Sequence, residues 1–125
     1  MPHLVADYSA NLAERCDIEM LQNTLYDAAV ASGVFPLGGI RVRFHRAEIY
    51  AIADRHKDNA YLSVVLRIGS GRSLEAKKTA GALIFQTLET FFADELAGGH
   101  FMLSVDMVEN DPDVSFKANG VHARL

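Results

Sequence analysis

The feature that most constrains this chain is a repeated order of predicted elements, strand, helix and strand, which occurs once on each side of a polar loop. In the first half, alternation at residues 3–8 and 40–45 predicts strands around a helix at 17–32. In the second half, strands at 61–68 and 101–108 enclose another helix. A strand-helix-strand crossover makes its two strands parallel. The sequence therefore predicts a duplicated β-α-β unit.

Both predicted helices carry clear signals at their ends. Asp17 can cap the first helix, which Gly33 terminates, and Ser73 can cap the second. The second helix has one apolar stripe, formed by Ile84, Leu88, Phe91 and Phe92. We therefore expect an α+β fold in which two helices cover one face of a four-stranded mixed sheet.

The other face of this sheet has no helix to cover it. Val5, Val65 and Leu103 suggest largely apolar strands, so we expect the protein to form a homo-oligomer through that face.

We interpret residues 1–125 as a single domain with pseudo-repeats at about 2–53 and 60–109 and a C-terminal arm at 112–125. Strand-like apolar residues in the arm predict pairing with a neighbouring subunit. A further short strand is predicted at 48–52.

Charge and cysteine content limit the classes of function. The net charge of −4 argues against a nucleic-acid-binding surface, which needs clustered Lys and Arg. The single cysteine, Cys16, cannot form an internal disulfide, and no apolar stretch near the start indicates a signal peptide or membrane segment. These features predict a cytoplasmic protein without a nucleic-acid or membrane partner.

Pro2 is the most distinctive candidate for catalysis. A small second residue permits removal of Met1, which would leave the secondary amine of Pro2 at the terminus. An α-amino group has a pKa near 8, and positive charge or an apolar pocket would lower it. Such an amine can accept a proton from one atom and return it to another, which is isomerisation without a cofactor.

Arg41 and Arg72 are the candidate binding residues for an anionic substrate. Arg41 follows the turn at residues 38–39, on the polar face of its predicted strand, and Arg72 precedes a helix N-terminus, which favours anions. Arg43 and His45 share the strand face of Arg41 and are weaker candidates.

Nucleotide and metal sites are not indicated. The stretch at residues 69–73 lacks the Lys-Ser/Thr ending of a phosphate loop, and the five histidines lack the spacing of zinc ligands. We therefore predict neither a cofactor nor a metal.

Four stretches, MPHL at residues 1–4, FPLGGIR at 35–41, IGSGRSLE at 68–75 and NGVHA at 119–123, resemble the 5-carboxymethyl-2-hydroxymuconate isomerase family of the tautomerase superfamily. The resemblance implies a homotrimer or hexamer built from duplicated βαβ units, with the trimer expected. It also implies bacterial breakdown of homoprotocatechuate, the pathway of 4-hydroxyphenylacetate. In this reaction the amine of Pro2 would move a proton from the 2-hydroxyl to C5, while Arg41 and Arg72 hold carboxylates.

Two alternatives stay open from the residues alone. The first is another tautomerase activity, on a smaller unsaturated dicarboxylate. The second is an oligomeric anion-binding protein that has kept the fold and lost the base.

Overall fold

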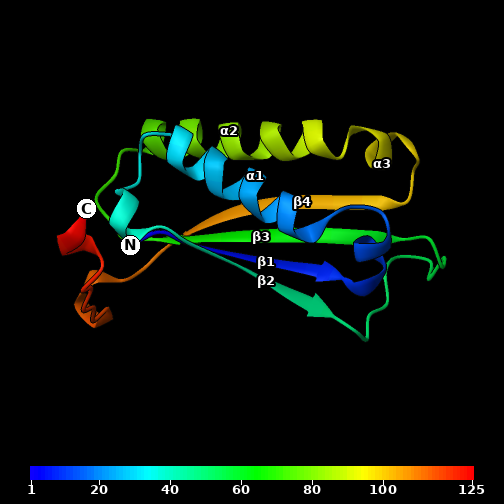
Figure 1. Cartoon of the computed structure of the whole chain (residues 1–125), viewed down its shortest axis with the longest axis horizontal. Helices are drawn as coiled ribbons and strands as arrows, with labels where there is room; N and C mark the ends of the chain where they lie inside the picture. Colours follow the sequence, from blue (N-terminus) through cyan, green and yellow to red (C-terminus); the bar gives the residue numbers. More distant parts are fainter.

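Four strands form one mixed sheet with the order β2-β1-β3-β4 in the computed structural model, which describes residues 1–125 (Figure 1). The strands are β1 (His3–Ser9), β2 (Arg41–Ala47), β3 (Ala60–Ile68) and β4 (Phe101–Glu109). β1 is parallel to β2 and β3 is parallel to β4, whereas the central pair β1 and β3 is antiparallel. The predicted four-stranded mixed sheet is confirmed.

The helices α1 (Ile18–Ala31), α2 (Leu74–Phe91) and α3 (Ala93–Ala97) lie on the same side of the sheet (Figure 1). The predicted caps form: Asp17 accepts hydrogen bonds from the backbone N–H groups at the start of α1, and Ser73 does so for α2. Gly33 follows α1 with φ +69°, a conformation that suits glycine. None of the helices combines the length and hydropathy that a membrane span requires.

The core lies between the helices and the sheet. It contains 18 buried residues, among them Leu4 and Leu62 from the central strands and Leu25 and Ile84 from the two long helices. Burying a side chain of this size contributes about 1.5 to 3 kcal/mol. Because both strand pairs and both helices share this core, it holds the two halves of the chain together.

The face of the sheet opposite the helices is more polar than the sequence suggested. Leu103 pairs in register with Leu62, whose side chain is buried under the helices, so Leu103 points toward the core and not toward the open face. On the open face, Val5 and Val65 lie directly opposite each other, and the same row continues to Arg43 and Asp106. The prediction of a largely apolar face is therefore wrong: a valine pair lies between charged edges.

The predicted short strand at residues 48–52 is also wrong. β2 ends at Ala47, and the chain then runs without a strand to Ala60. β1, the only partner of β2, ends at Ser9 opposite Ala47 and turns into η1 (Ala10–Glu14), so no strand runs beside this segment. Ile49 is 97% exposed and only Ile52 is buried.

The C-terminal segment forms two short 3₁₀ turns, η3 (Pro112–Val114) and η4 (His122–Arg124). No strand forms within it, and Val114 and Phe116 are 69% and 90% exposed. Pairing of this segment with a neighbouring subunit stays a prediction.

The antiparallel arrangement of β1 and β3 separates the starts of the two βαβ units. The first unit starts at the end of the molecule where both termini lie, and the second starts at the opposite end, after the loop at residues 48–59 (Figure 1). The two ends therefore hold different sets of polar side chains.

Candidate active site

Pro2 is buried at the start of β1, against the turn η2 (Leu37–Gly39). The N–H of Arg41 donates a hydrogen bond to the carbonyl oxygen of Pro2 at 3.2 Å, which extends the pairing of β1 with β2 by one step. A Cβ atom at Gly39 would lie 3.1 Å from Pro2 Cδ and 3.3 Å from Met1 Cα. The glycine therefore lets the first two residues pack tightly on the turn.

The C-terminal segment covers this same end of the molecule (Figure 1). Asn119 Nδ2 donates to the carbonyl oxygen of Gly38 at 2.9 Å, and Asn119 Oδ1 accepts from the N–H groups of Val121 and His122 at 2.9 and 3.0 Å. A Cβ atom at Gly38 would lie 2.5 Å from His122 Nδ1 and 2.8 Å from its Cα. Residues 115–125, which we call the tail, therefore dock on the glycine turn.

Arg72 is held beside the turn by three contacts. Its Nε atom donates to the carbonyl oxygen of Val34 at 3.4 Å, and its Nη1 atom donates to that of Gly69 at 3.3 Å. The guanidinium carbon also lies 5.3 Å from the centre of the Phe35 ring. These contacts orient the side chain and leave its charge without a carboxylate partner.

Three cations gather around the N-terminus: Arg41, Arg72 and, from the tail, Lys117. None of them takes part in any of the four ion pairs of the chain. Lys117 Nζ donates only to Ser115 Oγ, at 2.8 Å. The site therefore has unpaired positive charge, which suits an anionic ligand.

The amino group at this position is shifted toward its neutral form. Burial lowers the pKa of the Met1 amine below its usual 8.0, and the charges of Lys117, Arg72 and Arg41 lower it further, in that order of effect. The neighbouring imidazole of His3 shows the same trend, because burial and then Arg41 lower its pKa. Positive charge therefore acts on both titratable groups at the start of the chain.

Two cavities adjoin the N-terminus, and both are lined by Met1 and Arg41. One, of about 230 Å³, lies against the glycine turn and Asn119. The other, of about 200 Å³, also includes Lys117 in its lining. The N-terminal amine is thus next to space for a small molecule.

In the chain as described, Met1 is attached and the Pro2 nitrogen is part of a peptide bond. Two of the predicted site residues, Arg41 and Arg72, lie close enough to the terminus to influence its charge. Sequence reasoning missed Lys117 and Asn119. Asn119 lies in one of the family-like motifs, which could have drawn attention to it, whereas a single lysine in a terminal segment gives no local signal.

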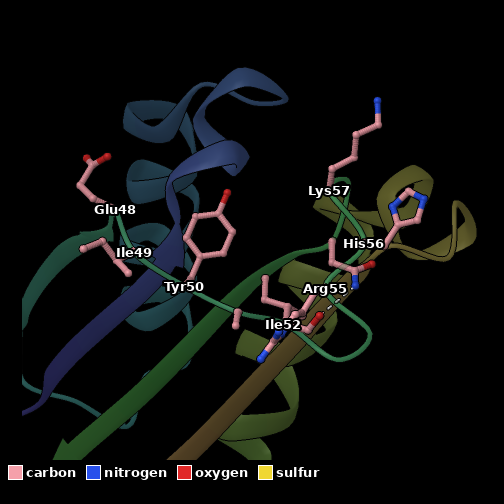
Figure 2. Close-up of a pocket in the computed structure, with 9 residues that line it drawn as sticks. Glu48, Ile49, Tyr50, Ile52, Arg55, His56 and Lys57 are labelled. Atoms are coloured by element: carbon pink, nitrogen blue, oxygen red, sulfur yellow. Dashed lines mark hydrogen bonds between the residues drawn. The ribbon is translucent and has the colours of Figure 1, made fainter.

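A larger cavity, of about 480 Å³, lies at the opposite end, along the loop at residues 48–59. Figure 2 shows the side chains of Glu48, Tyr50 and Lys57 spread along an open rim, not directed at a common point. Beneath the rim, Asn59 Nδ2 donates to the carbonyl oxygen of Ile52 at 3.1 Å and to Asp54 Oδ1 at 2.8 Å. The polar groups here bind one another.

The same end brings together His56, Asp58 and His100, whose possible metal-ligand atoms lie within 4.8 Å of one another. The sequence spacing did not indicate this grouping. The two imidazole rings stack 4.3 Å apart, and both Nδ1 atoms are already hydrogen-bonded, to the N–H of Asp58 and to Asn59 Oδ1. The rings would have to separate before their nitrogens could converge on one ion.

Such a site could belong to an isomerase or to a non-catalytic anion-binding protein, and similarity to known proteins distinguishes the two. The sequence model of the 5-carboxymethyl-2-hydroxymuconate isomerase family matches residues 2–125. The chain belongs to this family. The predicted family and the predicted class of enzyme, an isomerase, are therefore confirmed.

Relatives of this isomerase family match nearly the whole chain. A 5-carboxymethyl-2-hydroxymuconate Delta-isomerase of Escherichia coli is 37% identical over 123 residues, which are 98% of each chain. The crystal structure of a 5-carboxymethyl-2-hydroxymuconate isomerase from Deinococcus radiodurans R1 has a TM-score of 0.90 at 39% identity, covering 98% of this chain and 92% of the other. Another structure of a 5-carboxymethyl-2-hydroxymuconate delta-isomerase has a TM-score of 0.88 at 31% identity, with coverage of 99% and 92%.

More distant structures share the fold alone. They include a fused 4-OT symmetric trimer with a TM-score of 0.59 at 19% identity, which covers 97% of this chain and 98% of the other.

Proposed function

We propose that this isomerase converts 5-carboxymethyl-2-hydroxymuconate to its oxo-hexenedioate tautomer, with the amine of Pro2 as the base once Met1 has been removed. One observation carries the proposal: the N-terminus adjoins a small cavity among three cations that have no carboxylate partner. The substrate named for the Escherichia coli and Deinococcus relatives is a carboxylate-bearing molecule of this kind.

In the proposed reaction, the neutral Pro2 nitrogen takes the proton of the substrate's 2-hydroxyl group. The electron pair of that O–H bond forms the 2-oxo group, the conjugated double bonds shift, and C5 takes the proton back from the Pro2 ammonium. No cofactor is needed, because one proton leaves and one returns.

Arg41 and Arg72 would bind two of the carboxylates, for which a guanidinium offers paired N–H donors. Arg41, which is hydrogen-bonded through its backbone to Pro2, would also stabilise negative charge at the 2-oxo end of the substrate. Arg72, fixed by Val34, Gly69 and Phe35, would orient the other end.

The state of the terminus tests this proposal directly. Protein with Pro2 first and protein with Met1 retained are prepared and distinguished by intact mass. We expect the processed form to be about 10² to 10⁴ times faster, the range that a general base supplies. Equal rates from the two forms would rule out the Pro2 nitrogen as the base.

The pH dependence of the processed enzyme gives a second test. The base acts only when neutral, so kcat/KM rises as pH rises through its pKa. The burial and the cations that lower the pKa of the Met1 amine support the same direction for Pro2, so the rise should end at a lower pH than it would for an exposed N-terminal proline. A midpoint at or above the pKa of the terminal proline in an unfolded peptide that begins at Pro2 would contradict the proposed electrostatics.

We also propose that the protein works as a homotrimer. The fused 4-OT structure of the same fold is a symmetric trimer. In this chain the open face of the sheet presents a valine pair, Val5 and Val65, between Arg43 and Asp106, a mixture that suits an interface with a second copy. Phe116, an exposed aromatic residue of the tail, supports contact with a neighbouring subunit. Light scattering that gives the mass of a monomer would contradict this.

Finally, we propose a cytoplasmic location, where thiols remain reduced. Its support is Cys16, which is partly buried and packed against the core as a free thiol, with a pKa that burial raises. Fractionation of cells that express the native chain would test the location.

A further inference from the structure

We infer that Lys117 of the tail binds the third carboxylate of the substrate and thereby selects tricarboxylates over dicarboxylates. This inference rests on the proposed function, because it assumes that Arg41 and Arg72 bind the other two carboxylates. Lys117 was not among the residues that the sequence predicted.

The position of Lys117 is the first support. It lines the cavity of about 200 Å³ together with Met1 and Arg41, so it faces the same space as the N-terminus. The tail is far from β1 in the sequence but lies at the end of the molecule where β1 starts (Figure 1), and Lys117 lines the cavity together with His3, the first residue of that strand. A molecule that reaches the terminus through this cavity passes the ammonium group of Lys117.

The charge balance of the cavity is the second support. Arg67 and His3 also line it, while no aspartate or glutamate does. Lys117 Nζ donates only to Ser115 Oγ, a neutral partner two residues away. Cations brought together without an anion repel one another, and a bound carboxylate would remove this repulsion.

The anchoring of the tail is the third support. Asn119, two residues after Lys117, donates from Nδ2 to the carbonyl oxygen of Gly38 at 2.9 Å and lies 3.1 Å from the sulfur of Met1. The backbone of the tail is therefore attached to the glycine turn of the site. This attachment limits how far Lys117 can move, as a binding residue requires.

The chemistry of lysine fits the assignment. An ammonium group on a flexible stem is a point charge that meets a carboxylate from several directions, whereas a guanidinium requires a planar arrangement. The carboxymethyl group of the proposed substrate rotates about single bonds. A point charge therefore suits this carboxylate better than a fixed fork does.

The test compares two substrates, 5-carboxymethyl-2-hydroxymuconate and 2-hydroxymuconate, which lacks the carboxymethyl group. We expect Lys117→Ala to lower kcat/KM for the tricarboxylate about 10- to 100-fold, mostly through KM, as loss of a charge-assisted hydrogen bond would. The dicarboxylate should lose less than about threefold, and Lys117→Arg should restore most of the loss. Lys57→Ala, an exposed lysine at the opposite end, is the matched control.

Equal losses on both substrates, or no loss on either, would overturn the inference. A binding titration distinguishes failure of the inference about Lys117 from failure of the proposed function. Propane-1,2,3-tricarboxylate should bind the wild type more tightly than pentanedioate does, and Lys117→Ala should remove that preference. If the wild type isomerises neither muconate, the proposed function is wrong, and the titration still decides the role of Lys117.

Discussion

The two ends of the molecule differ in whether the polar side chains near their cavities have partners within the protein. At the end with the termini, Arg41, Arg72 and Lys117 have no carboxylate partner. At the opposite end, Asn59 satisfies three neighbouring polar groups, and Arg15 pairs with Glu95 and also donates to a backbone carbonyl oxygen. Polar groups that bind one another stabilise a loop, whereas unpaired charge next to a cavity is available to a ligand.

Cavity size alone favours the end opposite the proposed active site. The hollow along residues 48–59 holds about 480 Å³, more than either cavity beside the N-terminus, at about 230 and 200 Å³. Its lining carries both signs of charge, from Glu48, Arg55 and Lys57. Our proposal therefore rests on the charge of the lining and not on the volume of the cavity.

Inserting one residue should give the largest difference in activity between the two ends of the molecule. A glycine added in front of the mature Pro2 turns its nitrogen into an amide, so we expect kcat to fall about 10² to 10⁴-fold. A glycine inserted after Ile49, which is 97% exposed, should leave the rate within about twofold. Steady-state kinetics on both variants tests this, and similar losses would remove the contrast.

Removing a charge should have the next largest effect. Arg41→Ala should reduce kcat/KM about 10²-fold, because a guanidinium that binds a carboxylate is worth about 2 to 3 kcal/mol. The matched control is Arg46→Ala at the other end of β2, whose arginine forms a surface ion pair with Glu48 at 2.7 Å. If both arginine variants lose the same activity, Arg41 has no special role.

A single methyl group in the glycine turn should have a smaller effect. In Gly39→Ala the new Cβ meets Pro2 Cδ at 3.1 Å, so the proline must shift by a few tenths of an ångström, and we expect about a tenfold loss in kcat. Gly81→Ala within α2, where the new atom meets only Met107 Cε at 3.8 Å, an ordinary contact, is the control. Unchanged kinetics in Gly39→Ala would show that the seat of Pro2 is not critical.

At the opposite end the expected effect is on stability. Asn59→Ala leaves the carbonyl oxygen of Ile52 without this donor and should lower the free energy of unfolding by about 1 to 3 kcal/mol. The kcat of the folded enzyme should not change. Urea denaturation combined with kinetics measures both, and a fall in kcat at full folding would connect this loop to the active site.

The elements that local signals specify were predictable from the sequence. Asp17 and Ser73 mark the starts of α1 and α2, and the alternation of β2 placed Arg41 on the open face. What depends on long-range pairing was not predictable. The direction in which Leu103 points follows from its register with β3, and Lys117 reaches the N-terminus only because the tail docks on the glycine turn.

The docking of the tail also determines when Met1 can be removed. Met1 is held at the site by contacts that include Asn119 Nδ2 to Met1 Sδ at 3.1 Å, and Asn119 is synthesised only after all the strands and α-helices of the fold. An aminopeptidase therefore has its best access to Met1 while the tail is still within the ribosome. Folded protein that retains Met1 should resist the peptidase, and truncation after Val114 should restore processing.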